Sequence, residues 1–195
     1  MKKICFLLYL AVAVFTTAFA QEPSEHLTFK GLPIDGTLSS FVAKLKQKGF
    51  THIGTSDGIA LLSGEFASYK SCTVGVLSSK DKDVVVKVGV IFPSHETWSA
   101  LENNYVSLKK MLTTKYGEPT ECIETFQSYS QPTDDSQKLF ELKFDRCKYL
   151  TIFETGKGSI ELQLAHNSTS GCYVILSYYD AINQKAVVSS AIDDL

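Results

Sequence analysis

Residues 84–116 have the sequence VVVKVGVIFPSHETWSALENNYVSLKKMLTTKY, in which two different spacings of apolar residues follow one another. Over residues 84–92 apolar side chains alternate, which predicts a half-buried strand. Over residues 95–116 apolar side chains recur at steps of three and four, which predicts a helix ended by Gly117 and Pro119. The expected apolar stripe of this helix consists of Trp98, Leu101, Tyr105, Leu108 and Leu112. This stretch therefore joins one strand to one helix, each with a single apolar side.

The chain on both sides repeats this pattern. A first helix is predicted from the capping residue Thr37 to Gly49, with its stripe at Leu38, Phe41, Val42 and Leu45. Strands are predicted at residues 50–54, 59–66, 69–78 and 84–92, and again at 120–126, 147–155, 159–165 and 172–179. Residues 128–137 read as a surface loop, residues 139–144 fit a helical turn or a short strand, and residues 181–195 fit a loop with a terminal helix.

Runs of strands that twice follow one helix predict an α+β fold. We expect two tandem helix-plus-four-strand antiparallel repeats, residues 21–93 and 94–195, that form one sheet with the helices packed on one face.

The first twenty residues have the pattern of a secretory signal peptide. Lys2 and Lys3 precede an apolar run at residues 4–15, and Ala18-Phe19-Ala20 is a small-x-small cleavage site. Cleavage after Ala20 would shorten the chain from 195 to 175 residues and, with both lysines lost, change its net charge from −2 to −4. We therefore expect a periplasmic or secreted protein, and no later segment is apolar enough to span a membrane.

The basic residues argue against nucleic acid as a partner. Only Arg146 among the nineteen Lys and Arg residues is an arginine, so bidentate contacts to phosphates or bases are scarce. The cysteines Cys72, Cys122, Cys147 and Cys172 remain after cleavage, without a C-x-x-C motif. In an oxidising compartment they predict two disulfides. Three pairings are possible, of which we favour Cys122 with Cys147 and Cys72 with Cys172.

Three short motifs carry a resemblance to a known family. They are Leu32-Pro33-Ile34-Asp35-Gly36-Thr37, Lys115-Tyr116-Gly117-Glu118-Pro119 and Tyr178-Tyr179-Asp180. With the expected order of elements, they make the chain resemble uncharacterised bacterial periplasmic proteins that have a β-lactamase-inhibitor-protein-like fold. The resemblance implies a binding scaffold whose concave sheet face meets a partner, and it implies no catalytic residues. Inhibition of a β-lactamase is not implied, because a fold does not fix a function.

Strand alternation divides the apolar residues into two expected faces. Helices are expected to cover the face that carries Val74, Val76, Val84, Val86, Val88, Val90, Ile160, Leu162, Leu164, Val174 and Leu176. The other face then carries Tyr149, Phe153, Tyr173 and Tyr179 with Lys87, and it is more aromatic than a solvated face requires. Aromatic surfaces of this kind are typical of protein-binding sites. The alternative is that residues 181–195 or the 128–137 loop cover this face.

The sequence thus predicts a non-enzymatic, inhibitor-like binding module for a protein or peptide partner in the cell envelope. His26, His52, His95 and His166 are scattered without metal-ligand spacing, and no nucleophile motif occurs, so we expect neither a cofactor nor a metal. One alternative is a small-ligand or calcium-responsive domain that uses the Asp81-Lys82-Asp83 turn. Another is a hydrolase whose site is assembled from distant residues. The sequence leaves the oligomeric state open.

Overall fold

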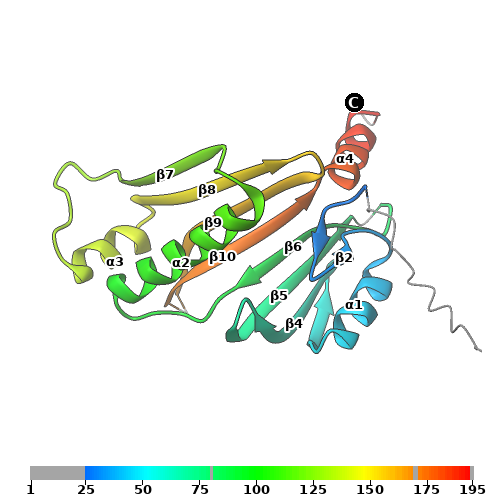
Figure 1. Ribbon diagram of the computed structural model, residues 1–195, viewed down its shortest axis with the longest axis horizontal. Coiled ribbons are helices and arrows are strands. Elements are labelled where there is room, and N and C mark those ends of the chain that lie inside the picture. Colours follow the sequence, from blue (N-terminus) through cyan, green and yellow to red (C-terminus); the bar gives the residue numbers. More distant parts are fainter. Residues whose placement is uncertain (1–24, 80, 169–170, 194–195) are drawn as a thin grey trace, which may run out of the picture.

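An antiparallel sheet of eight strands dominates the computed structural model, which describes residues 25–79, 81–168 and 171–193. The predicted signal peptide at residues 1–20 lies outside these described residues. The strands are β3 (Thr51–Ser56), β4 (Ile59–Phe66), β5 (Tyr69–Ser79), β6 (Val84–Ile91), β7 (Glu121–Phe126), β8 (Cys147–Thr155), β9 (Gly158–Asn167) and β10 (Gly171–Asp180). Their order in the sheet is β3-β4-β5-β6-β10-β9-β8-β7 (Figure 1). A small hairpin, β1 (Thr28–Phe29) with β2 (Leu32–Pro33), precedes them.

Four helices complete the α+β fold in the described part of the chain. They are α1 (Leu38–Gln47), α2 (Trp98–Tyr116), α3 (Asp135–Lys143) and α4 (Ala181–Asp193). Side-chain caps start three of them: Thr37 accepts from Ser40 N at 3.3 Å, Thr97 from Ala100 N at 3.3 Å, and Asp134 from Gln137 N at 2.8 Å. Helices α1, α2 and α3 pack against the sheet, whereas α4 projects from its end after β10 (Figure 1).

The core lies between the sheet and these helices. All five residues of the predicted stripe on α2 are buried, and so are Phe41 and Leu45 on α1. Burying a side chain of this size contributes roughly 1.5–3 kcal/mol, so the two stripes hold their helices on the sheet. The segment left open between helix and strand, residues 139–144, falls in α3 and its C-terminal cap, and Leu139 and Leu142 join the core.

The expected alternation fails at the start of β6. Val84 and Val86 were expected under the helices, but Val85 is fully buried there and both of its neighbours are half-buried. Leu77 pairs with Lys87 while Ser78 pairs with Val85, so Val86 is an extra residue without a partner in β5. Such a bulge reverses the side-chain alternation. From Val88 onward the expected alternation holds, and Val88 and Val90 are buried.

The two predicted disulfides are absent, since the four described cysteines are free. Cys122 lies opposite Thr151 and Cys147 opposite Phe126, so these cysteines are four residues out of register, about 13 Å along the strands. Cys72 on β5 and Cys172 on β10 are separated by β6, which places them roughly 10 Å apart. Both separations exceed what a disulfide can bridge, so the preferred pairings are wrong.

Burial makes the thiols unequal. Cys122 is exposed, Cys72 and Cys172 are buried, and burial raises the pKa of the half-buried Cys147 to about 12. Because the thiolate is the reactive form, we expect Cys122 to react first with a disulfide reagent. The folded chain that begins at Gln21 should then show about one reactive thiol per molecule. Unfolding should make the remaining three thiols reactive, and Cys122→Ser should remove the fast phase of the reaction in the folded chain. If no further thiols titrate after unfolding, the cysteines are paired and this assignment is wrong.

Candidate functional site

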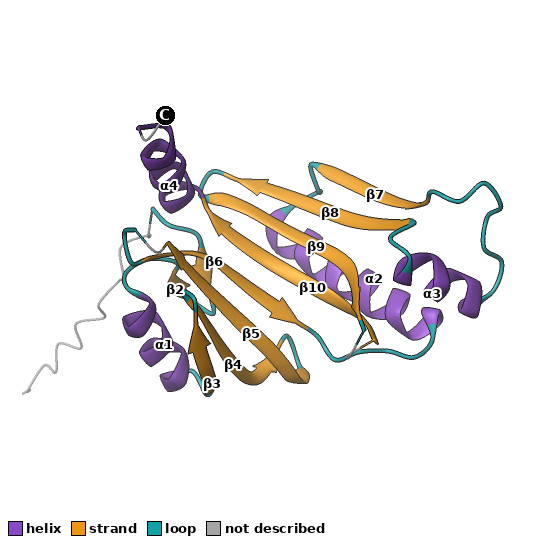
Figure 2. Ribbon diagram, turned by 180° about the vertical axis from the view of Figure 1, so that it is seen from behind, coloured by secondary structure: helices purple, strands orange, loops and turns teal. Residues whose placement is uncertain are grey.

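One face of the eight-stranded sheet carries no helix of the described chain. We call it the open face, and in Figure 2 strands β8, β9 and β10 pass in front of α2 on this side. The two segments expected as possible covers lie elsewhere: α4 projects beyond the strand ends, and residues 128–137 lead into α3 on the helix side (Figure 2). Directly paired residues of neighbouring strands share a face, so the register defines which side chains the open face carries.

Three of the predicted binding residues lie on the open face. Tyr179 pairs with Lys87, and the Lys87 ammonium lies 4.5 Å from the centroid of the Tyr179 ring, a cation–π distance. Tyr173, on the same strand, is only 7% exposed, and its hydroxyl accepts a 3.4 Å hydrogen bond from the Asn167 amide. Tyr173 lies six residues along β10 from Tyr179 and is buried, so the accessible part of the predicted aromatic patch is reduced to Tyr179 beside Lys87.

Tyr149 and Phe153 lie on the opposite, helix-covered face, and their predicted placement is wrong. Phe153 pairs with Ile160, a core residue, and is 1% exposed. The Tyr149 ring meets Trp98 and Tyr105 edge-on, with centroid distances of 5.2 and 5.5 Å. Burial, followed by the charge of Glu102, raises the pKa of the Tyr149 hydroxyl above its usual range. Both rings therefore hold α2 on the sheet.

Apolar side chains that sequence reasoning did not select take their place. Ile59 and Leu61 are each 42% exposed and Ile91 is 36% exposed. Register also places half-buried apolar residues on the open face: Leu77, Leu150, Ile152 and Ile175. The sequence does carry a signal for them, namely strands in which both odd- and even-numbered residues are apolar, such as residues 59–62 with the sequence IALL. Only one of these two sets can face the helices, so the other must lie on the open face.

Small residues cross the middle of the open face. Gly75 pairs with Gly89, and Gly89 pairs with Ser177, so these three form one row across β5, β6 and β10, which we call the small-residue band. A Cβ added to Gly75 would meet Leu61 Cδ2 at 3.8 Å, and one added to Gly89 would meet Ser177 Oγ at 3.9 Å, both ordinary contacts. Neither glycine has a positive φ. Backbone geometry and packing therefore do not require glycine here. Gly75 and Gly89 leave their part of the backbone half-exposed, whereas Ser177 is buried.

The two ends of the open face differ in chemistry. At the β3–β4 end a hollow of about 550 Å³ is lined by Gly54, Ile59, Leu61 and the intervening turn. At the β7–β9 end, register continues the row from Ser177 through Glu161 and Ile152 to Glu121. The open face is thus apolar at one end and carries carboxylates among apolar side chains at the other.

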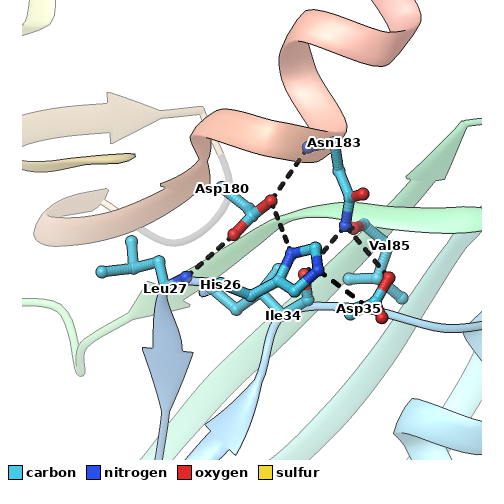
Figure 3. Close-up of polar contacts among 7 residues, drawn as sticks. All are labelled: His26, Leu27, Ile34, Asp35, Val85, Asp180 and Asn183. Atoms are coloured by element: carbon cyan, nitrogen blue, oxygen red, sulfur yellow. Dashed lines mark hydrogen bonds and ion pairs between the residues drawn. The ribbon is translucent and has the colours of Figure 1, made fainter. Parts of the chain in front are cut away.

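A second cluster, which we call the terminal clasp, joins four distant segments (Figure 3). The fully buried carboxylate of Asp180 accepts hydrogen bonds from Leu27 N at 2.8 Å and from Asn183 N at 2.9 Å, and it contacts His26 Nδ1 at 3.0 Å. The Asn183 amide donates to Ile34 O at 2.9 Å and to Val85 O at 3.0 Å. Asp180 therefore caps α4, and the clasp ties that helix to β6 and to the chain around β1 and β2.

The remaining candidate chemistry is sparse. Among the described residues, no group of three or more His, Cys, Asp or Glu side chains is placed to hold a metal ion. In the turn considered for calcium, Lys82 Nζ donates to Ala186 O of α4 at 2.8 Å. His52 on β3 contacts Thr55 and His166 on β9 contacts Asp145, and four strands separate β3 from β9 in the sheet. None of the described helices is both long and apolar enough to cross a membrane.

Comparisons with protein-family models, with curated proteins and with solved structures found no match to this chain. The resemblance to the β-lactamase-inhibitor-protein-like fold therefore depends on the order of elements and on three short motifs. In the structure these motifs lie at junctions: residues 32–37 run from β2 to the cap of α1, residues 115–119 end α2, and residues 178–180 end β10.

Proposed function

We propose that the protein is an exported, non-enzymatic binding module whose open face docks a protein partner of the cell envelope. The observation that carries the proposal is the exposure of Ile59, Leu61 and Ile91 beside the small-residue band on a sheet face without a covering helix among the described elements. Solvated sheet faces normally carry polar side chains, and a contiguous apolar patch marks an interaction surface. The signal-peptide pattern of residues 1–20 supports export.

The tandem-repeat arrangement belongs to the same proposal. Helix α1 followed by β3 to β6, and α2 followed by β7 to β10, would be the two units, with α3 inserted after β7 in the second. In the sheet, β6 and β10, the last strand of each unit, lie side by side and antiparallel, and the outer strands follow in mirrored order. This arrangement supports a fold of the β-lactamase-inhibitor-protein-like kind, with a broad sheet face as its binding surface.

The chemistry of the open face defines the partner. The small-residue band lets a partner segment approach the sheet backbone closely, and flanking side chains such as Ile91 and Ile175 offer it apolar contacts. Glu121, Glu154 and Glu161 lie on the same face toward β7 and complement a positive charge. We therefore expect a protein segment that presents apolar side chains next to lysine or arginine.

Site-specific photo-crosslinking tests the proposal. With p-benzoylphenylalanine at Leu61 or Ile91, we expect one adduct of defined mass in cells that produce the protein, because both side chains are exposed on the open face. The control position is Val106 on α2, which is 47% exposed on the other side of the molecule. An adduct at Val106 alone, or none at either open-face position, would contradict the proposal. A mass of twice the chain would identify the partner as a second copy.

Once the partner is purified, Ile91→Glu should weaken its binding about tenfold or more, because a carboxylate would replace an apolar contact next to the small-residue band. The melting temperature should stay unchanged, since Ile91 is exposed. Val106→Glu is the matched control and should leave the affinity within about twofold. Equal affinities of both variants would show that the partner binds elsewhere.

A further inference from the structure

A cavity of about 300 Å³ lies on the helix-covered side of the sheet, at a place that the proposed function does not use. Helix α2 forms one wall with its C-terminal half, and β10 contributes the floor. The β1–β2 turn and the β4–β5 turn close the other side. Its volume is at the lower end of the range of small-molecule sites. The lining residues are Thr28, Lys30, Gly31, Phe66, Ala67, Leu108, Met111, Leu112, Lys115, Tyr116, Leu176 and Tyr178.

The interior of this cavity is apolar. Leu108 and Leu112 are nearly fully buried on α2, and Leu176 is buried on β10. Phe66 stacks on Phe29 at a centroid distance of 5.1 Å, which fixes the ring that lines the side. The hydroxyl of Tyr178 is the buried polar group here, and burial raises its pKa well above the usual range, so it stays neutral. Such walls accept a hydrocarbon chain in place of water.

Two lysines mark the entrance. Lys30 and Lys115 line the cavity and are exposed, so their side chains lie at its mouth. Lys30 Nζ is 6.0 Å from the Phe66 ring centroid, and Lys115 Nζ is 4.8 Å from that of Tyr116. No ion pair with a described acidic side chain involves either ammonium. An apolar interior below two cations is complementary to a molecule with an anionic head and an apolar tail.

Both hairpin tips at the mouth have an unfavourable backbone. Lys30 has a φ of 52° before Gly31 at 76°, and Ala67 and Ser68 have φ values of 50° and 68°. Two-residue turns with positive φ at both positions normally use Asn, Asp or Gly. Other residues are strained in this region, and strain of this kind clusters at functional sites. A lysine at such a tip is therefore better explained by what its ammonium does than by the needs of the turn.

We propose that this cavity binds a soluble single-chain amphiphile with a carboxylate head, its chain between α2 and β10 and its head at Lys30 and Lys115. The cavity is partly open to solvent, so a single chain can enter it from solution without a membrane surface. The site is independent of the open face, so the two proposals can fail separately.

The decisive experiment uses decanoate as the probe and decyltrimethylammonium, with the same chain and the opposite charge, as its counterpart. Met111 lines the cavity, and the other methionine of the chain is Met1, so a methyl-labelled methionine signal reports this site directly. We expect decanoate to shift the Met111 methyl resonance saturably. The cationic detergent should bind at least about tenfold more weakly, because it meets two ammonium groups.

Charge-reversal variants distinguish the contribution of the two lysines to binding from that of the apolar walls. Lys30→Glu combined with Lys115→Glu should weaken decanoate binding about tenfold or more, whereas Lys44→Glu combined with Lys110→Glu should leave it unchanged. This double variant is the matched control, since it changes the net charge equally and both lysines are exposed and do not line the cavity. Equal weakening by both changes would assign the effect to net charge and overturn the proposal.

Lys30→Asn gives a readout that a purely structural role of Lys30 would not produce. Asn-Gly is the preferred sequence for this turn, so the melting temperature should rise while decanoate binding weakens. Unchanged binding in the stabilised variant would contradict the role of Lys30. Absence of any shift of the Met111 resonance up to millimolar decanoate, or equal binding of the cationic detergent, would exclude the site as an anion-amphiphile pocket.

Discussion

Asp180→Ala is expected to lower the free energy of unfolding by about 2–4 kcal/mol, because it removes the acceptor of a buried hydrogen-bond network. The fully buried Asp180 carboxylate accepts from Leu27 N and Asn183 N and contacts His26. Alanine would leave a buried N–H without an acceptor, which costs about 1–3 kcal/mol, and would remove the cap of α4, which costs about 1 kcal/mol more. Urea unfolding followed by circular dichroism measures the difference.

Two variants make this result specific to the terminal clasp. Asp180→Asn keeps one acceptor oxygen and should lose less stability than the alanine variant. Asp81→Ala removes an exposed carboxylate from the turn before β6 and should change the free energy of unfolding by less than about 0.5 kcal/mol. A loss below about 1 kcal/mol in Asp180→Ala would show that the clasp does not stabilise the fold.

Phe153→Ala should destabilise the protein by about 3–5 kcal/mol, because a large ring is removed from a packed core and leaves a cavity. Tyr179→Ala, on the open face, should cost less than about 1 kcal/mol, since that ring is half-exposed and its described partner is the Lys87 ammonium. Thermal or urea unfolding of both variants measures the contrast. The comparison tests directly which of the predicted aromatic residues belong to a surface.

The opposite ranking would reverse the assignment of faces. If Phe153→Ala were tolerated and Tyr179→Ala unfolded the protein, the strand registers of β8 and β10 would each be shifted by one residue, since such a slip moves every side chain of a strand to the other face. Gln163→Ala is the conservative control, because Gln163 lies on the open face between Ile175 and Leu150 and should have little effect on stability.

The sequence predicts the elements of this fold well because their periodicity is local. The alternation around Val88 and Val90 and the stripe from Trp98 to Leu112 depend on neighbours within a few residues, and both are observed. The faces were harder to predict. β8 carries apolar side chains on both of its faces, with Leu150 and Ile152 on one side and Tyr149 and Phe153 on the other. Periodicity cannot choose between these sides, which the pairing with β9 decides.

The candidate sites depend on contacts between distant segments. His26 and Asp180 are 154 residues apart in sequence, and no pattern in either segment indicates their contact. The cavity below Lys30 needs α2, β10 and two hairpin turns to meet. The bulge at Val86 and the unbridged cysteines likewise follow from strand register, which is a tertiary property. A local clue existed only at Lys30-Gly31, where a lysine precedes glycine in a tight turn.

The strand order also sets the sequence of events during synthesis. β6 lies in the middle of the finished sheet, yet its neighbour β10 is the last of the described strands to be synthesised. Until then the β3–β6 half ends in an unpaired edge rich in valine, a template for pairing with another chain. Contacts this distant in sequence form slowly. The growing chain therefore has a defined period of vulnerability to aggregation, which ends when residues 175–179 pair with β6 and Asp180 accepts hydrogen bonds from Leu27 and from the first turn of α4.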